Sequence, residues 1–132
     1  MGSLFKPGWE NHLEERLNGS SDFQSGARWF DGSVLLGMGD EILWLKIYDG
    51  RVIDHKPHLT PLGFTFALKA PEAIWRALLQ EDRNEILSYT GSKKILVEGN
   101  LLEFMRLTKT VIALVDGMCA LFREPKTGKD IR

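Results

Sequence analysis

The chain has 132 residues, of which 43% are apolar and 27% charged, and a formal net charge of -1. This length suits one domain with its own core, and the charge gives no electrostatic reason to bind nucleic acid or an acidic membrane. A single cysteine excludes an internal disulfide, and no uncharged apolar run reaches the roughly 18 residues of a membrane span. The first residues lack the basic and apolar stretches of a signal peptide, so we expect a cytoplasmic protein without stable membrane insertion.

The N-terminal segment predicts one short helix followed by a connector. Trp9, Leu13 and Leu17 recur at helical spacing, and the helix should end at Asn18-Gly19. Residues 20–26 have turn composition and a single large apolar residue. We therefore expect no regular element between this helix and the first strand.

Four strands are predicted between residues 28 and 69, separated by turn signals. The dipeptide Asp49-Gly50 is a strong signal for a type I′ hairpin, so consecutive strands should pair antiparallel. In the last strand Phe64, Phe66 and Leu68 should point to the same face and pack against a core. The expected strands are 33–38, 41–48, 51–56 and 63–69.

Two short helices and a fifth strand should follow. Pro71 is suited to the first turn of a helix whose apolar stripe includes Trp75 and Leu79. Asp82 and Glu85 have the spacing of a capping box for the second helix, which Gly91 is expected to end. The alternating residues 93–98 predict the fifth strand.

The longest predicted element is a continuous helix over residues 101–122. Asn100 and Glu103 have capping-box spacing at its start, and no proline interrupts it. Its polar positions form one narrow stripe that includes Asp116, and the rest of its surface is apolar. This surplus of apolar surface indicates either a ligand cavity or an apolar dimer interface.

No residue cluster in the sequence predicts catalysis, a metal site or a cofactor. His55 and His58 would point to opposite faces of a strand, and no third ligand accompanies them. Cys119 has apolar neighbours, which are typical of a buried, inert thiol. The segment Gly37-Met38-Gly39 lacks the third glycine and the following helix of a dinucleotide loop. We expect a protein that is not an enzyme.

The order of elements resembles the sterol carrier protein type-2 family of non-specific lipid-transfer domains. The resemblance covers roughly residues 8 to 122. It is carried by the hairpin of residues 42–52, by the strand and helix start in residues 64–75, and by residues 94–100, where Asn100 stands in place of the family's acidic residue. The C-terminus lacks a peroxisomal tripeptide, which suggests a non-peroxisomal relative.

The resemblance implies an α+β fold with a five-stranded, mostly antiparallel sheet covered on one face by helices. It further implies an apolar tunnel between the two layers for a fatty acid, acyl-CoA or sterol, which the protein binds or transfers. The domain is expected over residues 1–124, with a flexible tail at 125–132. One wall of the site is expected from Phe64, Phe66, Trp75 and Leu79, and the other from Met105, Val111, Leu114, Val115 and Met118.

Two alternatives remain open at this point. In the first, the apolar C-terminal helix forms a homodimer or docks to an enzyme of lipid or hydrophobic-substrate metabolism, and the interior is fully packed. In the second, the protein is a small enzyme acting on a lipid-like substrate, with His55 or Asp54 as the acid or base. The second alternative requires one of these side chains to reach the cavity.

Overall fold

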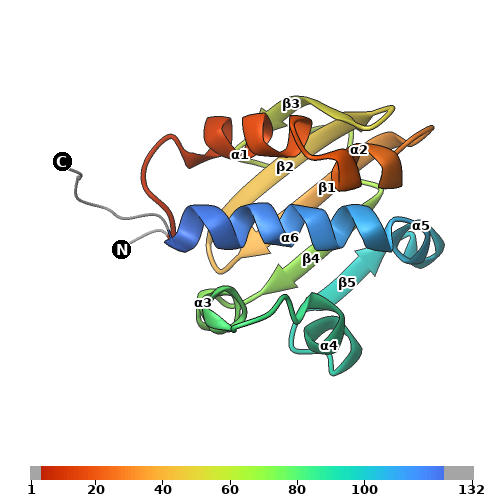
Figure 1. The fold of residues 1–132 in the computed structure, drawn as a ribbon. Coiled ribbons are helices and arrows are strands. Elements are labelled where there is room, and N and C mark those ends of the chain that lie inside the picture. The colour runs from red at the N-terminus through yellow and green to blue at the C-terminus, as the bar shows by residue number, and fades with distance from the viewer. Residues whose placement is uncertain (1–3, 124–132) are drawn as a thin grey trace, which may run out of the picture.

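The computed structural model describes residues 4–123, which build a five-stranded sheet and six helices. The strand order is β3-β2-β1-β4-β5 (Figure 1). Three of the four strand pairs are antiparallel, and β1 and β4 are parallel. The predicted α+β class with a mostly antiparallel five-stranded sheet is therefore confirmed. The strands are β1 Asp31–Met38, β2 Glu41–Tyr48, β3 Arg51–Lys56, β4 Phe66–Ala70 and β5 Leu96–Gly99.

The turn between β2 and β3 has the predicted hairpin conformation. Asp49 and Gly50 have φ angles of 47° and 86°, and two positive φ angles at the central positions define a type I′ turn. The expectation that all consecutive strands pair is wrong between β3 and β4. Residues 57–65 instead carry the chain across the sheet, and β4 pairs in parallel with β1.

Six helices accompany the sheet, and Figure 1 shows α1, α2 and α6 lying across one of its faces. The segment expected to be a connector forms α2. Ser20 caps it by accepting a hydrogen bond from the Phe23 amide at 3.1 Å, and the Phe23 side chain is fully buried. A side-chain cap and one buried anchor thus suffice for a helix of this length. The helices are α1 Trp9–Asn18, α2 Ser21–Gly26, α3 Glu72–Gln80, α4 Ile86–Gly91, α5 Leu101–Arg106 and α6 Thr108–Arg123.

The predicted continuous helix over residues 101–122 is divided at Leu107, so this expectation is wrong. Asn100 does cap α5, because its side chain accepts a hydrogen bond from the Glu103 amide at 3.0 Å. At the other end, the Thr108 hydroxyl donates to the Met105 carbonyl at 2.7 Å. A threonine side chain that bonds a nearby carbonyl competes with the helical backbone bonds, which favours the break.

The start of α4 also differs from the expected capping box. Glu85 precedes the helix without a side-chain cap, and Asn84 accepts the hydrogen bond from the Ile86 amide at 3.0 Å. An asparagine can bond the amide two residues ahead, so it replaces Asp82 in this role. At the end of the helix, Lys93 and not Gly91 has the left-handed conformation, with φ 65°.

The long helix α6 lies in the middle of the helical layer, which explains its apolar composition. It contacts α1 and α2 on one side and α3 and α4 on the other (Figure 1). Its exposed positions are Lys109, Asp116 and Arg123, at intervals of seven residues. Most of the apolar surface of α6 is covered within the chain, which leaves little of it for a second subunit. The homodimer expected through this helix stays a prediction.

One contact ties the helical layer to the sheet, and another holds two of its helices together. Asn18, at the end of α1, donates to the Val52 carbonyl at 3.0 Å and accepts from the Val52 amide at 2.8 Å, which ties the helix to edge strand β3. Gly26, at the end of α2, lies against α6, where the Thr110 hydroxyl donates to the Phe23 carbonyl. Close approach of α2 to α6 therefore depends on a residue without a side chain.

Replacement of Gly26 by alanine should destabilise the fold. A Cβ atom there would lie 2.5 Å from Thr110 Oγ1 and 2.9 Å from the Thr110 backbone nitrogen, so the two helices must separate. We expect a loss of about 1 to 3 kcal/mol in the free energy of unfolding, measured by urea denaturation. Gly91→Ala is the matched control, because nothing lies within 4 Å of its added atom. Equal stability of the two variants would contradict this packing.

Candidate functional site

The sheet buries side chains on both of its faces. Val34 and Leu36 belong to the core beneath the helices, whereas Leu35 belongs to a separate cluster with Trp44 and Ala67. This second cluster lies on the face opposite the helices, because successive residues of a strand point to opposite faces. Trp44 and Ala67 are nevertheless buried, so this face is partly covered.

The cover is the crossing loop of residues 57–65, which is bound to the sheet through Gly63. The Gly63 carbonyl accepts hydrogen bonds from Trp44 Nε1 at 2.8 Å and from Ser33 Oγ at 3.2 Å. Next to it, Thr65 donates its amide proton to the Ser33 carbonyl at 2.8 Å and accepts from the Ser33 amide. These bonds place the neighbouring residue Phe64 against the second cluster.

A groove of about 770 Å³ lies between this loop and the strands on the face opposite the helices. Pockets for small-molecule ligands commonly have volumes of this order and mainly apolar walls. The groove is partly open to solvent, and none of its lining residues belongs to α1, α2 or α6. Its large apolar lining residues are Leu35, Ile42, Leu59, Phe64 and Leu96.

Charged side chains surround this apolar lining. Lys69 forms an ion pair with Glu98 at 3.0 Å, and its ammonium group lies 5.8 Å from the centre of the Phe64 ring. Lys93 and Lys94 line the groove as well, and neither forms an ion pair within residues 4–123. The Lys94 ammonium group lies 4.8 Å from the centre of the Tyr89 ring. The groove therefore combines an apolar surface with two cations that have no acidic partner in the described residues.

The nine predicted site residues do not come together in this groove. Phe64 lines it, and Met105 is exposed on α5. Phe64 and Phe66 were expected on one face, which is wrong because β4 begins only at Phe66 and Phe64 belongs to the preceding loop. Seven of the nine are buried in the core beneath the helices: Phe66, Trp75, Leu79, Val111, Leu114, Val115 and Met118.

The residues considered for catalysis lie outside the groove. His55 Nδ1 is 2.7 Å from Glu14 Oε1 of helix α1, and Asp54 is exposed. Burial raises the pKa of the Cys119 thiol, which disfavours the nucleophilic thiolate. Among the described residues, no group of three or more His, Cys, Asp or Glu side chains could hold a metal ion. None of the helices in residues 4–123 is long and apolar enough to cross a membrane.

Continuous apolar runs in two strands are a sequence signal that the second face of the sheet is covered. Val34, Leu35 and Leu36 are buried in succession, as are Leu43, Trp44 and Leu45. A continuous apolar run in a strand indicates that both faces are covered, whereas alternation indicates one covered face. Such runs in β1 and β2 predict a cover on the second face, but they do not identify the loop that provides it.

The similarity of this chain to known proteins lies in its fold. No protein-family model matches the sequence, and a search of curated proteins finds no match. A crystal structure of sterol carrier protein 2 matches with a TM-score of 0.77 and 21% identity, over 90% of this chain and 99% of that one. A solution structure from Thermus thermophilus, described as possibly a sterol carrier protein, matches with a TM-score of 0.73 and 19% identity over 96% and 94% of the two chains.

A third similar structure is described as UbiJ-SCP2, a ubiquinone synthesis protein. It matches with a TM-score of 0.59 and 18% identity, over 83% of this chain and 90% of that one. These similarities extend over nearly the whole of each protein. The chain therefore has the fold of sterol carrier protein 2.

Proposed function

We propose that the protein binds a lipid-like molecule in the groove between the crossing loop and the open face of the sheet. The observation that carries this proposal is a groove of about 770 Å³ that joins an apolar lining to Lys93 and Lys94. The fold shared with sterol carrier protein 2 supports the same class of ligand. Of the ligands that the family resemblance implies, a fatty acid or acyl-CoA suits the groove better than a sterol, since both carry an anionic group.

The proposed mechanism is reversible binding without a chemical step or a cofactor. Each Å² of apolar surface removed from water contributes about 25 cal/mol, so an acyl chain along Leu35, Ile42 and Leu96 provides most of the affinity. The lysines orient the head group and contribute less, because ion pairs at exposed sites are worth about 1 kcal/mol or less. Binding therefore depends on chain length more than on the head group.

A site between the sheet and the helices, as predicted from the sequence, remains the competing location. Seven of its nine expected residues are closely packed, so a ligand there has to separate α6 from the sheet. The groove requires no such separation. The two locations differ in which substitutions weaken binding, because Leu96 lines the groove and is not part of the core beneath the helices.

Replacement of Leu96 by glutamate should weaken binding of a fluorescent long-chain fatty acid, cis-parinaric acid, by about tenfold or more. Leu96 is 50% exposed in the groove, so the new carboxylate opposes both the acyl chain and the fatty-acid head without disturbing the core. Fluorescence titration measures the affinity. The matched control is Leu87→Glu on α4, where the side chain is 46% exposed and outside the groove. Equal affinities of the two variants would place the ligand elsewhere, and no saturable binding at all would contradict lipid binding itself.

The double substitution of Lys93 and Lys94 by glutamine should reduce affinity for a fatty acid by up to about fivefold. It should leave affinity for the fatty alcohol of the same chain length unchanged, because the alcohol has no charge to pair. Displacement of cis-parinaric acid measures both affinities, and Lys56→Gln, outside the groove, serves as the control. An equal loss for acid and alcohol would show that the lysines do not act on the head group.

A further inference from the structure

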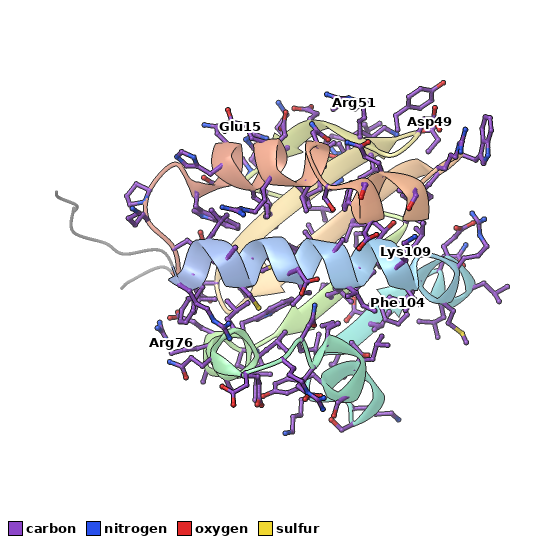
Figure 2. The ribbon with its side chains drawn as sticks, viewed as in Figure 1. Glu15, Asp49, Arg51, Arg76, Phe104 and Lys109 are labelled. Carbon is purple, nitrogen blue, oxygen red and sulfur yellow. The ribbon has the colours of Figure 1, made fainter. Side chains whose placement is uncertain are left out.

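One corner of the molecule exposes two aromatic side chains that the ligand groove does not use. Trp29, between α2 and β1, is 81% exposed, and Tyr48, at the end of β2, is 56% exposed. The Trp29 amide donates to Asp49 Oδ1 at 3.0 Å, so the two segments are joined. Figure 2 labels Asp49 and Arg51, which lie at this corner where β2 turns into β3. We call residues Arg28, Trp29, Tyr48 and Arg51 the aromatic corner.

The exposure of Trp29 is fixed by the backbone. Its φ angle is 70°, in the left-handed region that a bulky side chain rarely adopts. The bond to Asp49 and a bond from the Asp49 amide to the Phe30 carbonyl, at 2.8 Å, hold this conformation. The other tryptophans, Trp9, Trp44 and Trp75, are at most 4% exposed. An unusual backbone conformation that presents a large apolar ring to solvent indicates a contact surface.

Two arginines accompany the aromatic rings. The Arg28 guanidinium lies 5.7 Å from the centre of the Trp29 ring, and Arg51 is the cross-strand partner of Tyr48. Neither arginine forms an ion pair within residues 4–123. Two aspartates lie beside the corner: Asp31 forms an ion pair with Lys46 at 2.8 Å, and Asp49 accepts the hydrogen bond from the Trp29 amide. The corner therefore offers cationic groups beside exposed aromatic rings.

We infer that the aromatic corner docks the protein on a phospholipid bilayer. Tryptophan and tyrosine rings favour the boundary between head groups and acyl chains, and guanidinium groups pair with phosphates. The corner supplies both next to each other, and an anionic bilayer complements the two unpaired arginines. This surface lies apart from the ligand groove and does not depend on which ligand the groove takes.

Vesicle binding by the full chain tests this inference, with Trp29 as the reporter. The vesicles contain equal parts of phosphatidylcholine and phosphatidylglycerol, and the phosphatidylcholine is brominated near the head-group end of its acyl chains. Bromine quenches nearby tryptophans, so the fluorescence of wild type should fall on binding. Trp29→Phe should lose this quenching, because its three remaining tryptophans are buried.

Charge variants test the role of the arginines in the same assay. Arg28→Gln and Arg51→Gln should each weaken vesicle binding by about fivefold, and vesicles of phosphatidylcholine alone should bind more weakly than the anionic vesicles. Arg83→Gln, whose side chain is 85% exposed between α3 and α4, is the matched control and should bind like wild type. Circular dichroism establishes that each variant is folded.

Three results would overturn the inference. The first is no binding of wild type to anionic vesicles, and the second is equal binding by Arg28→Gln, Arg51→Gln and Arg83→Gln. The third is binding of a single-stranded oligonucleotide that depends on Arg28 and Arg51 in the absence of vesicle binding. Leu96→Glu should bind vesicles like wild type, so failure of the groove proposal is distinguishable from failure of this one.

Discussion

The arrangement of the open face depends on the carbonyl group of Gly63. This oxygen accepts hydrogen bonds from Trp44 and Ser33, both of which are buried. A buried indole N–H without a partner costs free energy, so the position of the crossing loop satisfies a requirement of the sheet. The same contact covers Trp44, directs Phe64 onto Leu35 and Ala67, and forms one wall of the groove. The groove is thus a consequence of how the chain reaches β4.

The two faces of the sheet differ in how completely they are covered. On the helical face, α6 fills the space between α1 with α2 and α3 with α4, and its apolar side chains belong to the same core cluster as strand residues such as Phe66 and Leu68. On the other face, one loop covers only the central strands. Lys69, Leu96 and Glu98 therefore lie in an open groove, where a bound molecule displaces solvent and not a packed side chain. This difference is the physical reason to locate a ligand on the less covered face.

The sequence predicted some local structure from a single residue or pair. Asp49-Gly50 specifies the type I′ turn, and Asn100 caps the helix that follows it. Other local signals were misleading, because Asn84 replaces the capping box expected for α4 and the Thr108 hydroxyl bonds a backbone carbonyl where a continuous helix was expected. The helix α2 depends on the burial of Phe23, which helical periodicity alone does not reveal.

The candidate site was less predictable than the fold for a related reason. Large apolar residues such as Trp75 and Val115 identify a core, but composition does not distinguish a packed core from a cavity. The groove instead uses Ile42, Leu96 and Lys93, which are unremarkable in sequence and come together only through the strand order. Phe64 was assigned to the wrong face because the strand begins two residues later than its apolar pattern indicates.

The two proposed surfaces are connected through β3. This edge strand runs from Arg51 of the aromatic corner to Lys56, where the crossing loop begins. Within residues 4–123, β3 pairs only with β2, and the register of this pairing shifts between Lys46 and Ile47 of β2. A hydrogen bond from Asn18 also holds β3. An edge strand with one partner is easier to displace than an inner strand, because fewer backbone hydrogen bonds must break. The aromatic corner and the wall of the groove therefore lie at the two ends of the most weakly paired part of the sheet.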